Sequence, residues 1–447
     1  RTVMSATQPA RGTRDFLPAD VRRREHVIGV VRRVYERYGF EPLETPAFEN
    51  IETLMGKYGE EGGKLIFKIL KRGDHEASGQ ADLALRYDLT VPLARVVAEH
   101  QATLPKYFRR YQIQPVWRAD RPARGRFREF YQCDVDALGS TSPVVEVEVI
   151  AAVSEVLATL GFADFHIRLN DRRLLAALLA TAGVPSSLET DALVALDKLD
   201  KIGADGVAAE LASRGIDPNV ARACLALFAS DPGESFDAVR ARLATALGDR
   251  ADALDTVTTI HALAEATPAA GRLRLDPGLA RGLSYYTGAI MEIAVPDLAG
   301  SLGGGGRYDH LVGMFLGRDV PACGFSLGLE RLIVVMTERG MFPASVGEAP
   351  ADVMVALWDE PSRADALALA AMLRAGGLRV DVYPEPGKPG RQFKYASGRG
   401  YPFVVLAGDD ERAQGTVSVK NMRTASQTTV PRAGVFEYID SQRRETE

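Results

Sequence analysis

A short stretch of the chain, residues 106–132, concentrates side chains that can bind phosphate. It holds eight basic and two acidic residues, a local balance of about +6 in a chain whose formal net charge is −5. The basic residues are Lys106, Arg109, Arg110, Arg118, Arg121, Arg124, Arg126 and Arg128, and the acidic ones are Asp120 and Glu129. Arginines that alternate along strands beside a turn can place several guanidinium groups on one face, where each matches phosphate oxygens bidentately. The alternative is an exposed hairpin whose charges only keep it soluble.

Aromatic residues between these arginines favour a nucleotide as the ligand. Phe127, Phe130 and Tyr131 are interleaved with the basic residues. A purine base needs an aromatic face beside the cationic groups that hold its phosphates. We therefore interpret residues 106–132 as a site for a nucleoside triphosphate.

A second stretch, LGGGGRYD at residues 302–309, has the glycine density of a phosphate-binding loop. No Lys-Ser or Lys-Thr follows it, and it does not lie at a strand-to-helix turn, so neither nucleotide-binding fingerprint applies. Closely spaced glycines in a strand instead let a ligand or another backbone approach closely. We expect that role here.

The segments around these motifs predict an antiparallel sheet with helices. A helix is expected over residues 18–39, where Pro18 stands near the start and Gly39 follows the last apolar position. FEPLETPAF, with two prolines, fits an edge or interface strand. Aromatic and branched residues predict strands over 65–70, 82–91, 107–120, 127–139, 282–295 and 322–328, and a helix over 329–340.

The remaining segments predict two further domains. Residues 171 to about 270 are rich in Ala and Leu and nearly free of aromatics, which is typical of a helical insertion that splits the sheet in sequence. After a linker, the residues from about 351 alternate strand and helix, as in a small α/β domain with a largely parallel sheet. The length of 447 residues agrees with about three domains.

Composition narrows the class of protein. The chain is 46% hydrophobic and 25% charged and has no apolar run of the ~18 residues that cross a bilayer, so we expect a soluble, cytoplasmic protein without membrane contact. Three separated cysteines and six scattered histidines favour neither disulfides nor a protein-built metal site. The acidic net charge, taken over the whole chain, argues against a nucleic-acid partner.

Seven segments in order point the other way, because together they resemble the histidyl-tRNA synthetase family. They are RGTRDFLP (11–18), FEPLETPAFE (40–49), LRYDLTVPLAR (85–95), WRADRPARGRFREFYQCDVD (117–136), ARGLSYYTG (280–288), GGGRYDHL (304–311) and GFSLGLERL (324–332). The resemblance implies an α+β fold: an antiparallel class II synthetase catalytic core with a helical insertion, plus a C-terminal α/β anticodon-binding domain. It divides the chain into core (1–170), insertion (171–272), core (273–340), linker (341–350) and anticodon-binding domain (351–447).

The resemblance also implies roles for individual residues. ATP, with Mg²⁺ held mostly by its phosphates, would be bound by Arg118, Asp120, Arg126, Phe130 and Arg331. L-Histidine would be bound by Asp88, Leu89, Thr90, Arg118, Gln132, Asp136, Arg281, Tyr285 and Tyr286. Arg118 and Arg281 would be catalytic, since a fixed cation at the α-phosphate stabilises charge as the histidine carboxylate attacks ATP.

The partners that the resemblance implies are tRNA(His) and a second copy of the chain. Arg121 and Arg124 would approach the acceptor end of the tRNA, and Arg391 and Lys394 the anticodon side. Ser284, Asp120 and Ala123 depart from the usual family residues. The alternatives are a non-catalytic regulatory subunit of ATP phosphoribosyltransferase, another class IIa synthetase, and an accessory paralogue that binds tRNA without charging it.

Overall fold

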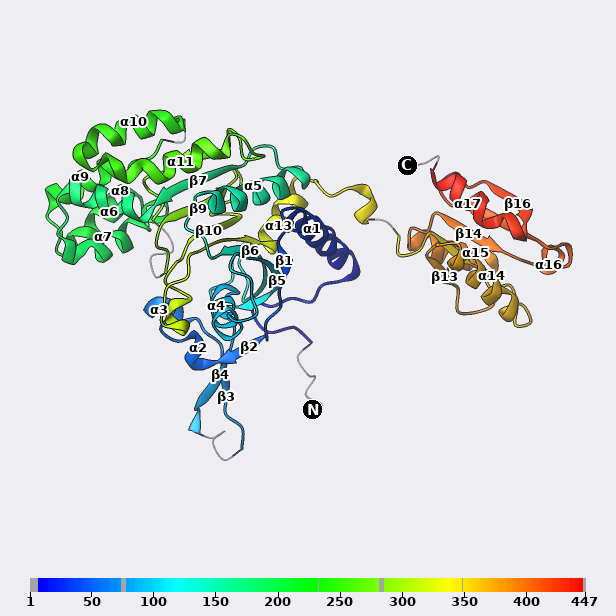
Figure 1. Cartoon of the computed structure of the whole chain (residues 1–447). Coiled ribbons are helices and arrows are strands. Elements are labelled where there is room, and N and C mark those ends of the chain that lie inside the picture. The colour runs from blue at the N-terminus through cyan, green and yellow to red at the C-terminus, as the bar shows by residue number, and fades with distance from the viewer. Residues whose placement is uncertain (1–6, 74–77, 232, 281–284, 348, 445–447) are drawn as a thin grey trace. The chain divides into compact units, whose positions relative to one another are not determined.

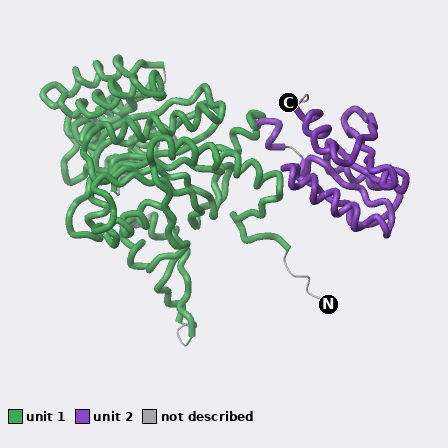
Figure 2. The backbone as a smooth tube through the Cα atoms, turned by 45° about the vertical axis from the view of Figure 1, so that its right-hand side comes forward, with its two compact units in different colours: residues 1–342 green, residues 343–447 purple. Residues whose placement is uncertain are grey.

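The computed structural model describes residues 7–73, 78–231, 233–280, 285–347 and 349–444. The chain divides into two compact units, residues 1–342 and residues 343–447 (Figure 2). No helix in the described ranges is long and apolar enough to cross a membrane. Each unit has a sheet and a hydrophobic core of its own.

The centre of unit 1 is an eight-stranded sheet (Figure 1). Its strands, in spatial order, are β1 (Glu41–Pro42), β5 (Phe108–Trp117), β6 (Glu129–Leu138), β11 (Ala322–Gly328), β10 (Gly303–Arg307), β9 (Ala289–Ala294), β7 (His166–Asp171) and β8 (Leu273–Leu275). Only the two outer pairs, β1 with β5 and β7 with β8, are parallel. The predicted antiparallel core is confirmed, although β9 begins at Ala289, later than the predicted start at residue 282.

Strand β6 shows why one face of the sheet is apolar and the other polar. Cys133, Val135 and Ala137 are buried in the main hydrophobic core. The residues between them are polar, and because side chains alternate along a strand they point to the opposite face. Three helices pack against β6: α1 (Pro18–Arg37), α5 (Val144–Thr159) and α13 (Leu329–Glu338). Helix α1 also contacts the other two. The sheet therefore has one face for packing and one for a ligand.

A small sheet and three helices lie beside the polar face, and part of this region differs from the prediction. The small sheet has strands β2 (Phe48–Asn50), β4 (Ala81–Leu85) and β3 (Lys68–Leu70), and the helices near it are α2 (Ile51–Leu54), α3 (Gly59–Lys64) and α4 (Thr90–Glu99). The strand predicted over 82–91 is wrong after Leu85. The Asp88 carboxylate accepts the Val91 backbone N–H at 3.1 Å, which satisfies a free donor in the first turn of α4 and favours helix there.

In the described part of the sequence between β7 and β8 lie six α-helices and two short 3-10 helices. The α-helices are α6 (Arg172–Ala182), α7 (Glu189–Leu196), α8 (Leu199–Ser213), α9 (Pro218–Phe228), α10 (Phe236–Leu247) and α11 (Asp255–Ala264). Side-chain caps start three of them: Asp171, Asp217 and Ser235 each accept a backbone N–H of the first turn. Their buried leucines belong to the same hydrophobic core as the sheet.

Unit 2 is a five-stranded sheet in the order β13 (Val380–Val382), β12 (Val353–Val355), β14 (Phe403–Leu406), β15 (Thr416–Asn421) and β16 (Gln427–Pro431). Its helices are α14 (Arg363–Ala375), α15 (Pro389–Gly398), α16 (Asp409–Gln414) and α17 (Val435–Arg444). The first three strands are parallel, as predicted, but β14, β15 and β16 pair antiparallel, so the sheet is mixed.

Candidate active site

The polar face of the large sheet forms the wall of a cleft of about 510 Å³. This volume falls in the range of small-molecule sites. Eleven of the residues proposed from the sequence line it: Asp88, Thr90, Arg118, Asp120, Arg126, Phe130, Gln132, Asp136, Tyr285, Tyr286 and Arg331. Segments far apart in the chain thus meet at one place.

Arg118 lies between two aromatic rings on the cleft wall. Its Nε donates to the Tyr87 carbonyl at 3.0 Å, and its guanidinium carbon lies 4.3 Å from the centre of the Tyr87 ring and 5.1 Å from that of Phe130. One hydrogen bond and two rings fix the orientation of this cation. Arg118 can therefore hold an anionic group beside the flat face of Phe130.

The turn between β5 and β6 carries a second cation. Backbone hydrogen bonds in both directions between Ala123 and Arg126 close the turn, with Gly125 at φ +68°. Arg126 makes a bidentate ion pair with Asp120, at 3.1 and 3.0 Å. Opposite this turn, Arg331 at the start of α13 donates to the Ser301 carbonyl. Arg126 and Arg331 thus present positive charge from two elements of the fold.

Asp88 is a buried carboxylate on the cleft wall, with an exposed fraction of 4%. It accepts from the Tyr58 hydroxyl at 2.9 Å as well as from the Val91 N–H. Removal from water raises its pKa, while its hydrogen bonds and Arg118 act in the opposite direction. Such a group gains most from a ligand that brings a positive charge.

Three polar side chains of β6 point into the cleft: Gln132, Asp134 and Asp136. They lie opposite Gln114, Gln112 and Arg110 of β5 in the antiparallel register. Arg110 is wholly buried and its Nη2 lies 2.9 Å from the Asp136 carboxylate. Arg110 therefore pairs with a buried carboxylate, and the sequence interpretation that made it a phosphate-binding residue is wrong.

Aromatic hydroxyls complete this part of the cleft. The Tyr308 hydroxyl donates to Asp136. Tyr285 and Tyr286 are half-buried neighbours whose ring centres lie 4.8 Å apart. Loss of hydration raises the pKa of both phenols, so both remain neutral donors at physiological pH.

The floor of the cleft is backbone. A Cβ at Gly303 would lie 2.3 Å from the Ser326 carbonyl oxygen, and one at Gly305 would lie 2.2 Å from that of Gly324. At Gly324 itself a Cβ would lie 1.8 Å from Asp136 Oδ1. The glycine run therefore permits close backbone approach, as expected, and lines the cleft with backbone.

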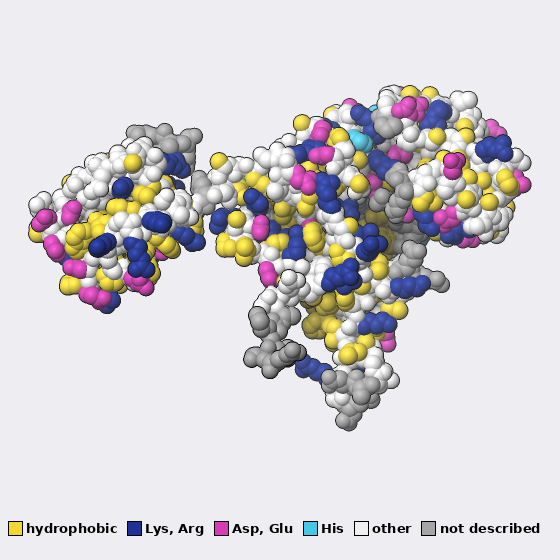
Figure 3. Space-filling view, turned by 180° about the vertical axis from the view of Figure 1, so that it is seen from behind, with side chains coloured by type: hydrophobic (Ala, Val, Ile, Leu, Met, Phe, Trp, Pro, Cys, Tyr) yellow, Lys and Arg dark blue, Asp and Glu magenta, His cyan; other side chains and the backbone are white. Residues whose placement is uncertain are grey.

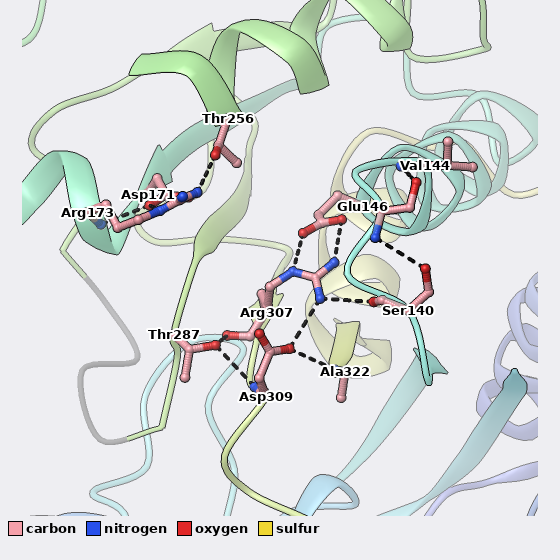
Figure 4. Close-up of polar contacts among 11 residues, drawn as sticks. Ser140, Val144, Glu146, Asp171, Arg173, Thr256, Thr287, Arg307, Asp309 and Ala322 are labelled. Atoms are coloured by element: carbon pink, nitrogen blue, oxygen red, sulfur yellow. Dashed lines mark hydrogen bonds and ion pairs between the residues drawn. The ribbon is translucent and has the colours of Figure 1, made fainter. Parts of the chain in front are cut away.

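A buried ion pair holds the end of this glycine strand (Figure 4). Arg307 donates from Nε and Nη2 to the Glu146 carboxylate at 2.6 and 2.8 Å, and from Nη1 to the Ser140 carbonyl and to Asp309. Glu146 lies on α5, so the pair joins β10 to the helical layer. Because Tyr308 follows Arg307 directly, the same pair fixes the approach of Tyr308 to Asp136.

Phe127 also lines the cleft, whereas the residues proposed for tRNA and Leu89 do not. Leu89 is buried, and its carbonyl accepts from Arg110 at 3.2 Å. Arg121 and Arg124 are exposed, and Arg124 pairs with Glu338. Arg391 and Lys394 are exposed on α15 of unit 2. Arg281 and Ser284 lie outside the described residues.

Tyr58, Asp134 and Tyr308 make contacts in the site and were not proposed from the sequence, whereas Arg110 was proposed only as a phosphate-binding residue. The alternation of side chains along a strand could have identified Asp134, because it lies two residues from both Gln132 and Asp136 and so shares their face. Tyr58 gives no such signal, because its position depends on how α3 packs beside Asp88.

Charge is unevenly distributed over unit 1. On the face shown in Figure 3, Lys and Arg side chains gather over the middle of the unit, whereas acidic side chains are more frequent over the helical insertion. The net charge of −5 averages over such regions and does not describe any one of them. The exclusion of nucleic acid from whole-chain charge is therefore not justified.

One face of the largely antiparallel sheet carries a hairpin with arginines and aromatic residues, and buried carboxylates line the same cleft. This fold and site define the catalytic core of a class II aminoacyl-tRNA synthetase. Comparison with known proteins agrees. Residues 12–332 match the family described as histidyl-tRNA synthetase, and residues 352–442 match the family described as anticodon binding domain.

Individual relatives are similar over nearly their whole length. Histidine–tRNA ligases of Gloeobacter violaceus and Christiangramia forsetii are each 40% identical, over 96% and 94% of this chain and 97% and 96% of theirs. The crystal structure of histidyl-tRNA synthetase from Nostoc sp. PCC 7120 has a TM-score of 0.80 at 31% identity and covers 98% of this chain and 100% of its own. The chain belongs to the histidyl-tRNA synthetase family.

Proposed function

We propose that the chain is a histidine–tRNA ligase. In the first step, the carboxylate of L-histidine attacks the α-phosphate of ATP, which forms histidyl-adenylate and releases pyrophosphate. In the second step, the terminal ribose hydroxyl of tRNA(His) attacks the acyl group and AMP leaves. The observation that carries the proposal is the single cleft in which a cationic and aromatic hairpin meets buried carboxylates and tyrosines.

The ATP half of the cleft is assigned to the hairpin and α13. Arg118, already oriented by two rings, holds the α-phosphate, and Phe130 stacks on adenine. Arg126 and Arg331 hold the terminal phosphates, with Asp120 releasing Arg126 as the nucleotide enters. Arg281 is assigned to the α-phosphate, where a fixed positive charge stabilises the developing charge.

Mg²⁺ enters with ATP as part of the substrate. Two further carboxylates of the cleft wall, Glu292 and Glu330, are already held by arginines at 3.1 and 2.8 Å. This arrangement suits an ion carried mainly by phosphate oxygens, with few protein ligands.

The histidine half of the cleft is assigned to the buried polar groups. Asp88, with the neighbouring backbone of Leu89 and Thr90, receives the α-ammonium group, and Gln132 supports it from β6. Asp136 receives a ring N–H, and the half-buried Tyr285 and Tyr286 enclose the imidazole. Each proposed contact pairs a buried acceptor with a donor of the substrate, as desolvated polar groups require.

The tRNA is assigned to more exposed residues. Arg121 and Arg124 lie in the turn between β5 and β6, and Arg391 and Lys394 lie on α15 in the part that matches an anticodon-binding domain. The proposed domains are a catalytic core (1–170 and 273–340), a helical insertion (171–272), a linker (341–350) and an anticodon-binding domain (351–447). We further propose that the enzyme acts in the cytoplasm as a homodimer.

The regulatory-subunit alternative is disfavoured. The similar relatives are histidine–tRNA ligases along nearly the full chain, including the anticodon-binding part. The described cleft also retains Arg118, Tyr286 and Arg331.

Exchange of labelled pyrophosphate into ATP tests the proposal. We expect exchange by the purified full chain with L-histidine and none with threonine, proline or glycine, the substrates of the other synthetases considered. A folded protein that binds ATP but shows no exchange with histidine would refute the enzymatic function. Exchange with another of these amino acids would replace histidine as the substrate.

A further inference from the structure

Two buried carboxylates of the cleft share one buried guanidinium. Asp134 and Asp136 each have an exposed fraction of 2%, and Arg110 between them has 0%. The Arg110 Nη2 lies 2.9 Å from Asp136 Oδ2 and 4.0 Å from Asp134 Oδ2. With both carboxylates ionised, this group of three carries one negative charge in excess.

Among the described residues, Arg110 is the one cation within ion-pair distance of Asp134. Gln112 and Ser326 face it across the two strand pairs, from β5 and β11. The titratable groups that act on it from further elements are Arg86 and Asp88 beside β4, Tyr35 of α1, Cys133 of β6 and Tyr285. Arg86 keeps its positive charge, but its guanidinium is held by the backbone carbonyls of 45, 46 and 115 and by Gln114, and it forms no ion pair with Asp134. Tyr35, Cys133 and Tyr285 are neutral, because burial raises the pKa of each.

Within the described residues, one oxygen of Asp134 has no hydrogen-bond partner. Asp134 Oδ1 is buried without a partner there, and so is Gln132 Oε1 two residues away; Arg110 Nε and Nη1 also lack partners, but Arg110 does not line the cleft. Both residues line the cleft. An unpaired buried acceptor costs about 1–3 kcal/mol, and water alone would not supply the missing positive charge. The cluster therefore fits a ligand that brings both a donor and a positive charge.

We propose that the cleft binds histidine with its side chain as the imidazolium cation, and that Asp134 is the residue that selects this charged form. The inference rests on the proposed function. That function assigns Asp88 to the α-ammonium group, and Arg118 to the carboxylate and α-phosphate. The imidazole is then the one part of the substrate left to balance Asp134, Asp136 and Arg110. Its free pKa lies near neutrality, so a modest electrostatic preference is enough to protonate it.

The proton has two sources, depending on pH. Burial, only partly offset by Arg110, raises the pKa of Asp134 in the empty site to about 7. At pH 8 both Asp134 and free histidine lack the proton, so the ring takes one from solution as it binds. At pH 6, Asp134 of the free protein holds a proton, and so does the ring of most free histidine molecules. The complex holds only one of these two protons. Binding at pH 6 therefore releases the other to solution.

Calorimetry of histidine binding to the full chain, in buffers of different ionisation enthalpy, measures this proton count. We expect uptake approaching about one proton per site at pH 8 and net release at pH 6. The isosteric variant Asp134→Asn should lose the uptake at pH 8 and bind histidine about tenfold more weakly, since a charge-assisted hydrogen bond is lost. Asp237→Asn, on an exposed side chain of α10, is the matched control and should keep the wild-type count.

Each result bears on a different claim. No uptake by the wild-type protein at pH 8, with histidine binding intact, would overturn the imidazolium proposal and leave the proposed function standing. Undiminished uptake by Asp134→Asn would overturn the role of Asp134. Failure of the wild-type protein both to bind histidine and to support pyrophosphate exchange would refute the proposed function, and with it this inference.

Discussion

The ion pair between Arg307 and Glu146 yields a prediction whose size can be worked out from the structure. Removing one partner of a buried pair costs about 3–5 kcal/mol, because the other charge stays buried. Glu146 and Arg307 have exposed fractions of 2% and 8%. After Glu146→Gln, Arg307 would keep the Ser140 carbonyl at 3.1 Å and Asp309 at 3.2 Å, and the amide oxygen could accept one bond. We therefore expect a loss at or somewhat below the lower limit of this range, about 2–3 kcal/mol in the free energy of unfolding.

The two tryptophans of the chain make the assay specific to unit 1. They are Trp117 in β5 and Trp358 in unit 2. In a Trp358→Phe background, urea unfolding followed by intrinsic fluorescence therefore reports on unit 1 alone, and the shift of its transition gives the change in unfolding free energy.

A neighbouring ion pair on the same helix provides the control. Glu148 pairs with Arg109 at 3.0 Å, with both side chains about one-third exposed. Glu148→Gln should cost less than about 1 kcal/mol, as is usual for exposed pairs. Replacing both buried partners with apolar residues, as in Glu146→Leu with Arg307→Met, should recover part of the loss. Equal, small losses for Glu146→Gln and Glu148→Gln would refute the reasoning from burial.

Two further predictions concern single charges. Arg281→Ala should reduce pyrophosphate exchange at least ~10²-fold while histidine binding is largely kept, and an unchanged rate would remove Arg281 from its proposed role. Asp134→Asn should alter the pH dependence of stability without ligand. The folded-state pKa of Asp134 is raised to about 7. The contribution of this carboxyl to the free energy of unfolding of the wild-type protein therefore decreases as the pH rises from its unfolded-state pKa to about 7. The unfolding free energy of the variant relative to wild type should therefore increase by about 1 kcal/mol or more from pH 5 to pH 8, and a constant difference in urea titrations would contradict this.

The sequence predicts the parts of this fold whose signal is local. Strands β5 and β6 alternate polar and apolar residues along their length, and their predicted bounds differ from the structure by one to three residues. Strand β11 agrees at both ends, at Ala322 and Gly328. The motifs around Arg118 and Arg331 can also each be identified within a short segment. The family resemblance then assigns these two distant segments to one site.

The parts that the sequence does not predict depend on contacts between distant segments. The helix beginning at Thr90 has strand-like residues, and Asp88 caps its first turn only because Tyr58 and the sheet hold the carboxylate there. Arg110 belongs to a basic run, but the register of β5 against β6 places it opposite Asp136 and buries it. Neither fact can be read from composition or spacing alone.

The backbone floor made by Gly303, Gly305 and Gly324 has a consequence for inhibition. A competitive inhibitor with a flat ring resting on this floor would contact peptide groups, which a point mutation can change only by adding a side chain. At these three positions the added Cβ would lie within 2.3 Å of an oxygen atom of the protein itself. Substitution at these three positions would thus damage the enzyme before it excluded the drug. At Gly304, which also lines the cleft, a Cβ would lie 3.3 Å from the Met291 carbonyl oxygen, so escape mutations are expected at Gly304 and on the walls of the cleft.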